Sequence, residues 1–233
     1  MTSSLNALFA ATVVFVGGHF LLSSAAVRHS LIRRLGEQGF RAGYAIVAVA
    51  SFVWMLLAYG KAPYLEVWPT QPALAWMPAV LMPIAFFLAV AGLTTRSPTA
   101  VGGESLVIDG AHDISPGILR ITRHPFLWGA TLWALSHIAV NGDAANLVMM
   151  LGILVLSLGG MRHIDLRRES ALDAAWGPIA LTTSLIPFAA IAQGRTTMDW
   201  KGIGLWRPAL ALVLYVVFLQ LHEAIIGVSA LPA

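Results

Sequence analysis

Long apolar runs separated by short polar stretches make up most of the chain. These runs cover residues 5–27, 42–60, 73–94, 122–140, 144–161 and 208–229. Each is close to the roughly 20 residues that a helix needs to cross a bilayer. Polarity does not alternate within the runs, as it would in the strands of a transmembrane barrel. The pattern therefore predicts an all-α protein, a polytopic integral membrane bundle of six transmembrane helices.

A seventh apolar stretch, residues 179–193, leaves the predicted number of transmembrane helices at six or seven. The stretch has about 15 residues with Pro187 near its middle, so a re-entrant or interfacial course is the alternative to a crossing. If it does not cross, Arg195, Lys201 and Arg207 fall on the same side of the membrane as the earlier arginines. The positive-inside rule therefore favours six spans.

Arginines also set the predicted orientation of the chain. No Lys or Arg precedes the first apolar run, whereas Arg28, Arg33 and Arg34 follow it directly. This charge order is the reverse of that in a cleavable signal peptide, and Arg-rich loops stay on the cytoplasmic side. We therefore expect the N-terminus outside and the first run retained as an anchor in the lipid bilayer.

Composition narrows the class of protein further. Of the 233 residues, 58% are hydrophobic and 11% are charged, which excludes a water-soluble globule and predicts a single transmembrane domain over residues 1–233. The formal net charge of +3 comes from basic residues scattered between apolar runs. We therefore expect contacts with lipid headgroups and no nucleic-acid partner. The chain has no cysteine, so a metal ion would need oxygen ligands or the seven histidines.

Four histidines lie in the apolar runs or at their ends: His19, His124, His137 and His222. An ionisable side chain in hydrocarbon is costly, so each is expected to be hydrogen-bonded or functional. One interpretation is a neutral ring bonded to a neighbouring helix. The other is an axial ligand of haem, because neutral imidazole binds haem iron and two facing helices can supply one ligand each.

The depth of each histidine along its helix limits which two can share one iron atom. At a rise of 1.5 Å per residue, His137 lies about 22 Å from the inner end of its run, and His19 lies about 12 Å from the inner end of its own. His222 lies about 21 Å from the inner end with six spans and about 10 Å with seven. Six spans therefore match His137 with His222, and seven match His19 with His222.

A second group of candidate residues, Arg123, His124 and Pro125, marks the start of the fourth run. One interpretation is helix-start chemistry, with a proline in the first turn and an arginine anchored to headgroups. The other is a binding site, because Arg123 at a positive helix N-terminus suits a carboxylate, a phosphate or a haem propionate. Downstream, Asp165 stands at helical spacing to Arg168, a pair typical of a solvated helix end.

Several short motifs spread over nearly the whole chain match one family of membrane proteins. They are Gly18 with His19, Ser23 with Ser24 and Arg28, Arg123 with His124 and Pro125, Ser136 with His137, Thr183 with Ser184, Pro187 with Phe188 and Ala189, Gly194 with Arg195, and residues 226–229. In these motifs the chain resembles the NnrU family of bacterial membrane proteins, whose plant relative is the 15-cis-zeta-carotene isomerase.

The resemblance implies a helical protein of the bacterial cytoplasmic membrane. It implies b-type haem in the isomerase branch, with His19 and His137 at positions similar to those of the ligands. It also implies cis-trans isomerisation of a polyene, an apolar small-molecule substrate, without identifying a redox partner. In some bacteria the family is linked to nitric oxide and denitrification, so a role in that metabolism or in assembly is an alternative function.

A more remote resemblance is to isoprenylcysteine and phospholipid methyltransferases, which use S-adenosylmethionine. It rests on Arg123, His124 and Pro125 followed by Gly129, and on Glu169 with Leu172, Trp176 and Gly177. The spaced tyrosines of those enzymes are replaced by residues 178–181, and residues 178–188 offer few side chains that would orient a cofactor of that size. Methyl transfer is therefore a further alternative, for which we expect no specific S-adenosylmethionine binding.

Overall fold

The computed structural model describes residues 2–69, 71–100, 102–108 and 113–231. These residues form helices and connecting loops, with an isolated β-bridge between Glu66 and Asp143, so the predicted all-α class is confirmed. The chain divides into two compact units, residues 1–75 with 134–156 and residues 76–133 with 157–233. Helices α5 (Pro125–Val140) and α6 (Ala144–Leu172) each contribute residues to both units, which are described in turn.

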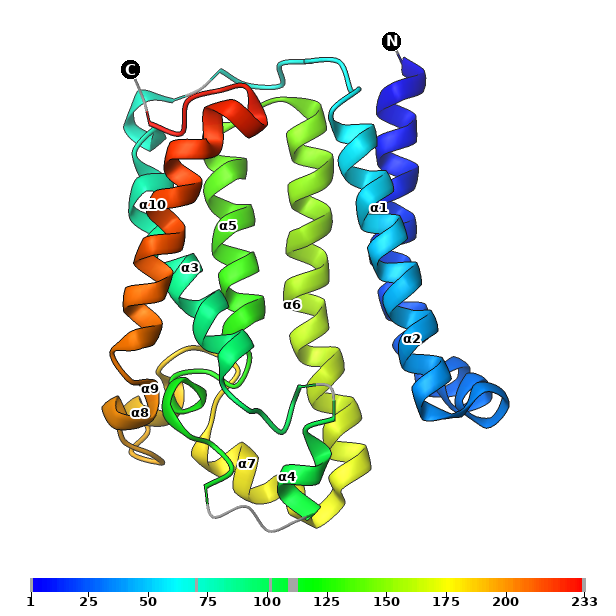
Figure 1. The fold of residues 1–233 in the computed structure, drawn as a ribbon, viewed down its shortest axis with the longest axis vertical. Coiled ribbons are helices and arrows are strands. Elements are labelled where there is room, and N and C mark those ends of the chain that lie inside the picture. Colours follow the sequence, from blue (N-terminus) through cyan, green and yellow to red (C-terminus); the bar gives the residue numbers. More distant parts are fainter. Residues whose placement is uncertain (1, 70, 101, 109–112, 232–233) are drawn as a thin grey trace. The chain divides into compact units, whose positions relative to one another are not determined.

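The first unit is built on the pair of helices α1 (Thr2–Ser23) and α2 (Ala25–Tyr59), which lie side by side (Figure 1). The rings of Phe15 and Phe52 meet between them at 5.5 Å. The first part of α6 packs against α1, because a Cβ added to Gly152 would lie 2.3 Å from Thr12 Cγ2. The short 3-10 helix η1 (Pro72–Leu74) ends the loop that follows α2.

Helix α2 is broken near its start by Gly36, whose φ of 73° and ψ of 167° are not helical. This left-handed backbone region favours glycine. An N-terminal segment, residues 25–35, therefore leaves the direction of the apolar segment 37–59. The predicted boundary between the first two helices was wrong, because the first helix ends at Ser23 and the second begins at Ala25, well before residue 42.

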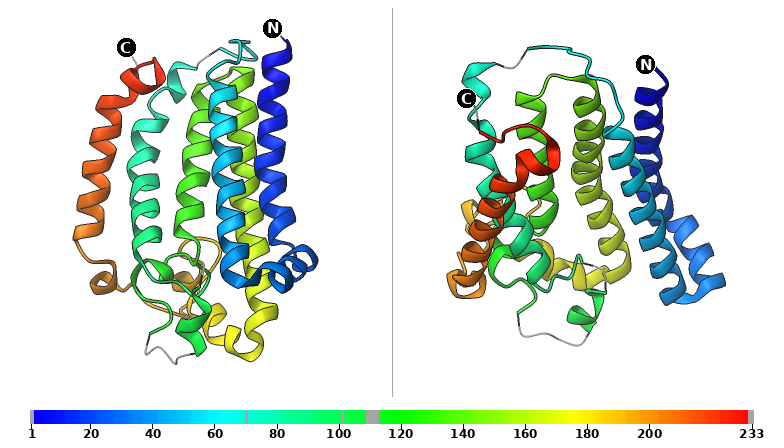
Figure 2. Two further views of the ribbon diagram at one scale, coloured as in Figure 1. Left: turned by 45° about the vertical axis from the view of Figure 1, so that its right-hand side comes forward. Right: turned by 45° about the horizontal axis from the view of Figure 1, so that its top comes forward.

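The second unit contains helices α3 (Met77–Thr94) and α10 (Trp206–Ile226), which lie side by side (Figure 2). Their contact includes the ring of Phe86 against those of Tyr215 and Phe218, at 6.0 and 5.5 Å. The first part of α5 approaches α3 closely, because a Cβ added to Gly92 would lie 2.5 Å from Phe126 N. Small residues of this kind allow membrane helices to pack with their backbones near one another.

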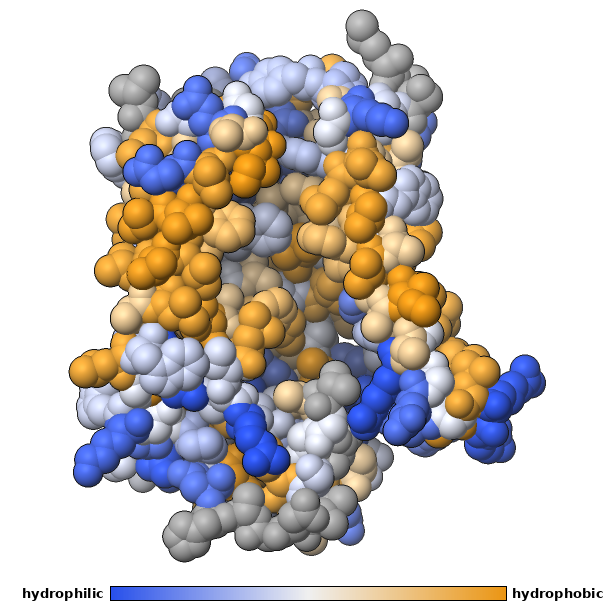
Figure 3. Space-filling model, viewed as in Figure 1, coloured by the Kyte–Doolittle hydropathy of each residue, from blue (hydrophilic) through white to orange (hydrophobic). Residues whose placement is uncertain are grey.

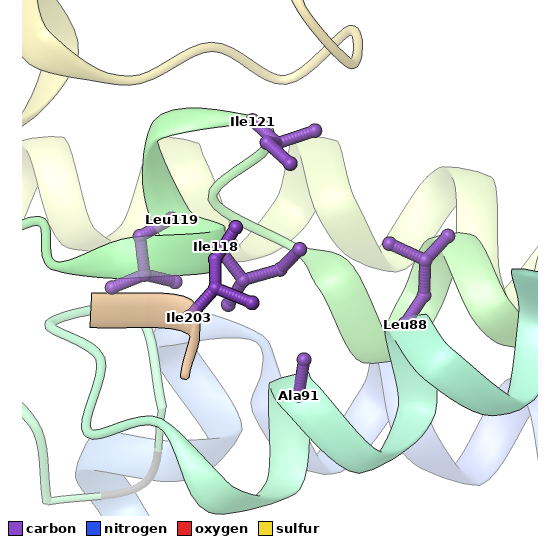
Figure 4. Close-up of a cluster of buried hydrophobic side chains, with 6 residues drawn as sticks. All are labelled: Leu88, Ala91, Ile118, Leu119, Ile121 and Ile203. Carbon is purple, nitrogen blue, oxygen red and sulfur yellow. The ribbon is translucent and has the colours of Figure 1, made fainter. Parts of the chain in front are cut away.

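Short helices complete the second unit around a buried apolar cluster. They are α4 (Glu104–Ile108), η2 (Gly117–Arg120), η3 (Asp173–Ala175), α7 (Trp176–Thr182), α8 (Ala189–Ala192) and α9 (Trp200–Ile203). The cluster joins α3, η2 and α9 through Leu88, Ala91, Ile118, Leu119, Ile121 and Ile203 (Figure 4). Asp199 adds a polar contact, since its carboxylate accepts hydrogen bonds from Gly117 N at 2.8 Å and Gly202 N at 2.9 Å.

Within the described part of the chain, five helical stretches are long and apolar enough to cross a membrane. They are Ser4–Ser23, Ala25–Tyr59, Pro72–Thr94, Ala144–Thr182 and Trp206–Ile226. Helix α5 is apolar too but has 16 residues, about 24 Å of helix against a hydrocarbon core of about 30 Å. Hydrophobic side chains cover the long helices on the visible face (Figure 3). The structure therefore supports an integral membrane protein.

The apolar stretch 179–193 does not form one continuous helix. Helix α7 ends at Thr182, the next six residues are not helical, and α8 begins at Ala189. Phe188 has a φ of 64°, which is uncommon for a residue other than glycine. Neither short helix is long enough to cross a bilayer, so a seventh crossing by this stretch finds no support.

We expect Gly129→Ala to destabilise the second unit. The added Cβ would lie 2.7 Å from the backbone oxygen of Ala85, and backbone atoms of a packed helix cannot move aside easily. Overpacking of this kind costs about 1 to 3 kcal/mol. The matched control is Gly160→Ala, whose Cβ would make an ordinary 3.9 Å contact with Leu127 Cδ1. Thermal unfolding in detergent should show a lower Tm for the first variant alone, and equal Tm values would contradict the packing.

Candidate functional site

Two places in the structure bring together side chains that could take part in binding or catalysis. The first, here called the Asp165 cluster, lies in the second unit around Asp165 of α6. The second, here called the His19 site, lies between α1 and α2 in the first unit. The candidate residues from the sequence divide between them and two further positions, those of His137 and His222.

The Asp165 cluster is a buried ionic group that joins α6 to the start of α5. Arg123 Nε donates to Asp165 Oδ2 at 2.9 Å, and His124 Nε2 lies 2.7 Å from Asp165 Oδ1. The side chains of Arg123, His124 and Asp165 are 15%, 3% and 4% exposed. Burying an unpaired charge is costly in free energy. Pairing the carboxylate with the guanidinium lowers that cost for both groups.

Other segments of the second unit also converge on Arg123. Its Nη1 donates to Thr183 Oγ1 at 3.2 Å, and its guanidinium lies 5.5 Å from the ring centroid of Trp176. Its backbone N–H donates to Ser184 O at 3.0 Å, and its backbone oxygen accepts from Thr99 Oγ1 at 3.1 Å. Arg123 therefore connects α6, the stretch after α7 and the loop after α3, using protein partners throughout.

The non-helical part of the stretch 179–193 is held against the entrance of α5. Leu185 O accepts hydrogen bonds from Thr122 Oγ1 at 3.0 Å and from Trp128 Nε1 at 2.8 Å. Phe188 N donates to Ile121 O at 2.8 Å. These bonds satisfy backbone groups that a broken helix leaves open, which is how irregular backbone is tolerated near a membrane.

The structure brings together two of the predicted site residues, Arg123 and His124, through a residue that was not chosen for the site. Asp165 pairs with both of them, and Arg168, at helical spacing from it, donates to Ala100 O. Spacing rules within one helix cannot reveal a partner some forty residues away. Burial of an acidic side chain in an otherwise apolar helix was the available signal.

The His19 site starts from a histidine whose ring is already oriented. His19 Nδ1 lies 2.7 Å from Phe15 O. A carbonyl oxygen only accepts hydrogen bonds, so Nδ1 carries a proton and Nε2 is the ring nitrogen that could bind a metal. Histidines that bind metals typically donate a hydrogen bond in this way from the ring nitrogen that does not bind the metal. The ring also meets Tyr44 of α2 edge-on at 5.6 Å.

Open space adjoins His19 between α1 and α2. A small pocket there is lined by Gly18, His19, Leu22, Tyr44, Val47, Ala48 and Ser51. A Cβ added to Gly17, Gly18 or Gly43 would meet no atom within 4 Å. Of these glycines Gly18 lines the pocket, a narrow notch beside the imidazole, whereas Gly17 is exposed on α1. The notch is too small for a macrocycle, so haem bound through His19 would require α1 and α2 to move apart.

His137 lies far from His19 in the first unit. Its backbone oxygen accepts a hydrogen bond from Asn146 Nδ2 at 3.1 Å, which sets its level on α6. Further along α6, Gly152 contacts Thr12 of α1, so these two residues lie at the same level. Helices α1 and α6 begin at the same end of the unit and run in the same direction (Figure 1). The steps from Asn146 to Gly152 and from Thr12 to His19 together amount to about 20 Å along the helices. The structure therefore does not bring the two histidines together.

His124 and His222 belong to the second unit and differ in what they offer. His124 Nε2 is engaged by Asp165, as described above. His222 lies in the last turns of α10, where its Nδ1 is 2.8 Å from Val228 O, so Nδ1 carries a proton as in His19. Among the residues that the structure describes, no group of three or more His, Cys, Asp or Glu side chains is placed to hold a metal ion.

Comparison with known proteins assigns the chain to a family. The family model described as NnrU protein matches residues 7–230. The chain belongs to the NnrU family. This NnrU protein is 27% identical over 191 residues to 15-cis-zeta-carotene isomerase, chloroplastic, of Zea mays, covering 79% of the chain and 50% of the maize protein. The NnrU resemblance predicted from the motifs is confirmed.

A second plant protein shows a shorter match. It is the 15-cis-zeta-carotene isomerase, chloroplastic, of Arabidopsis thaliana, 37% identical over 82 residues, which is 35% of the chain and 22% of the plant protein. The NnrU chain thus spans half or less of the curated relatives it matches. No solved structure matches it.

We expect Asp165→Ala to destabilise the NnrU protein strongly. The substitution removes the acceptor of both Arg123 and His124 and leaves a buried guanidinium without its carboxylate. Breaking a buried pair in this way costs about 3 to 5 kcal/mol. The matched control is Asp113→Ala, which removes an ion pair with Arg120 whose side chains are 40% and 27% exposed. That loss should cost less than about 1 kcal/mol.

Urea or thermal unfolding of both variants in detergent measures this difference. A small effect of Asp165→Ala, similar to that of the control, would show that the cluster does not hold the segments together.

Proposed function

We propose that this NnrU protein is a membrane haem protein that binds b-type haem through His19, and that it isomerises a double bond of a polyene. The observation that carries the proposal is the imidazole of His19, which Phe15 O orients in an apolar setting between α1 and α2. The names of the two plant relatives support the class of reaction.

The chain's own residues supply the binding side of this proposal. Phe15 O fixes the ring of His19, so that Nε2 is presented with little loss of side-chain freedom. Leu22, Val47 and Ala48 give the surroundings of His19 the apolar character that a hydrocarbon substrate requires. When bound, haem iron would supply a centre that contacts the polyene and lowers the barrier to rotation about one bond without net oxidation.

The proposal assigns His19 before His137. Joint ligation would require α1 to slide along α6 by most of the roughly 20 Å that separates the two histidines. After His19, His222 is the next candidate for an iron ligand, because its Nδ1 also lies against a carbonyl oxygen. His124 ranks lower because its Nε2 already contacts Asp165. A haem propionate is assigned to neither Arg123 nor His124, since protein groups already engage both.

We expect the protein purified after haem-replete expression to carry b-type haem, and His19→Ala to lose most of it. The matched control is His29→Ala, an exposed histidine on the N-terminal segment of α2, which should keep its haem. Pyridine haemochrome analysis gives the stoichiometry. Colourless wild-type protein, or unchanged haem in His19→Ala, would overturn the assignment. Recovery of the absorbance when imidazole is added to His19→Gly would separate ligand loss from misfolding.

We expect the haem-loaded protein to convert 15-cis-zeta-carotene in liposomes to an isomer of the same mass. Chromatography of the extracted pigments measures the conversion, and His19→Ala should slow it at least tenfold while His29→Ala does not. Haem-loaded wild-type protein that leaves the carotenoid unchanged would refute the isomerase assignment. An absorbance shift on adding nitric oxide to that protein would then favour the nitric oxide alternative.

A further inference from the structure

We infer that the N-terminal segment of α2, residues 25–35, is an interfacial helix that binds anionic phospholipid headgroups. Its apolar face lies against the acyl chains, and its exposed arginines contact the lipid phosphates. Lipid binding by this segment depends on neither haem nor a polyene substrate, so it goes beyond the proposed function. The segment belongs to the first unit and lies outside both the His19 site and the Asp165 cluster.

The segment lies outside the part of α2 that can cross the bilayer. The break at Gly36, with a φ of 73° and a ψ of 167°, separates it from residues 37–59. Those residues alone provide about 34 Å of helix, which is enough to cross a hydrocarbon core of about 30 Å. The segment follows almost directly on α1, which ends at Ser23, and its turns lie at the lower end of the α1 and α2 pair (Figure 1). It therefore begins where the hydrocarbon ends.

The segment has one apolar face and one basic face. Val27, Leu31 and Leu35 recur at every fourth residue, so they share one side of the helix. Leu35 is 57% exposed, so the protein leaves the end of this face uncovered. Arg33 and Arg34 lie on the remaining circumference and are exposed. A helix with this division of residues lies in the plane of a bilayer interface, with its apolar face toward the acyl chains.

The segment also carries an excess of positive charge. It contains Arg28, Arg33 and Arg34 and no acidic residue. Glu37, just after the break, accepts from Arg28 at 2.8 Å and from Arg41 at 3.1 Å, so one carboxylate serves two guanidinium groups. Among the residues that the structure describes, neither Arg33 nor Arg34 forms an ion pair. Both can therefore bind phosphate oxygens through charge-assisted hydrogen bonds.

Arg28 positions the segment and does not itself contact the lipid. Its Nη2 donates to Glu37 Oε1 at 2.8 Å, across the break at Gly36. Its guanidinium carbon lies 5.4 Å from the centre of the Phe40 ring, which is also beyond the break. These contacts tie the segment to the transmembrane part of α2. Arg33 and Arg34 are thereby held at the level of the headgroups.

An anionic phospholipid is the partner that matches both faces of the segment. An acidic protein would match the arginines but not the uncovered apolar face beside the end of a membrane helix. Figure 3 shows hydrophilic side chains gathered around this segment, below the apolar surface of the long helices. Each arginine near an anionic membrane surface strengthens binding about fivefold. A zwitterionic headgroup carries its own balancing positive charge, so the segment selects anionic over zwitterionic lipid.

Native mass spectrometry of the full-length protein in neutral detergent measures its affinity for added phosphatidylglycerol and phosphatidylcholine. We expect the wild type to bind phosphatidylglycerol about tenfold or more tightly, since two arginines contribute. Arg33→Gln combined with Arg34→Gln should lose most of this preference. The matched control, Arg162→Gln with Lys201→Gln, removes the same charge from exposed side chains elsewhere and should keep the preference.

Three results of this titration would overturn the inference. Equal affinities of the wild type for the two lipids would do so and would favour an acidic protein as the partner. An equal loss of preference in both double variants would show that net charge, and not this segment, sets the preference. An unchanged preference in the folded variant that lacks Arg33 and Arg34 would place the lipid elsewhere.

Spin labels test the position of the segment while both arginines are kept. The chain has no cysteine, so one introduced cysteine carries the label. In phosphatidylglycerol liposomes, a label on Leu35→Cys should be more accessible to molecular oxygen, which concentrates among acyl chains, than to a water-soluble nickel complex. A label on Ala26→Cys, at an exposed position on the opposite side of the helix, should show the reverse. Equal access of the nickel complex to both labels would contradict an interfacial helix, even if the glutamine variants do not fold.

Discussion

A polar group that enters hydrocarbon must find its hydrogen-bond partner inside the protein, and this constraint shapes the NnrU structure. Asp165 meets it by joining Arg123 and His124, which draws the loop after α3 and the stretch after α7 toward α6. His19 meets it within one turn of α1, by donating from Nδ1 to a carbonyl oxygen. The first solution stabilises the fold, and the second leaves Nε2, the atom that we propose as an iron ligand.

The difference between these two solutions separates structural from functional candidates. In the Asp165 cluster every group that the sequence nominated for binding already has a protein partner, so the cluster resembles a structural clamp more than an anion site. In the His19 site, Nε2 is the ring nitrogen that Phe15 O does not engage.

The sequence predicted the apolar helices well but not the breaks between them. The runs 73–94, 144–161 and 208–229 correspond to α3, the apolar part of α6 and α10. Residues 25–41 are too polar for a hydropathy pattern, yet they continue as helix because backbone hydrogen bonds do not depend on side-chain polarity. The break at Gly36 and the partner of Asp165 depend on tertiary contacts, which no local pattern contains. The depths of His19 and His137 were counted from the inner ends of the apolar runs, and the contacts between helices in the structure place the two histidines further apart.

The central claim is that His19 is an axial ligand in a site formed by α1 and α2. The most direct measurement is an experimental structure of the haem-loaded protein in a lipid environment, at a resolution that shows side chains. The account predicts iron bonded to Nε2 of His19, with the Nδ1 bond to Phe15 O retained. Iron bonded to other histidines, with the notch between α1 and α2 filled by lipid, would contradict it.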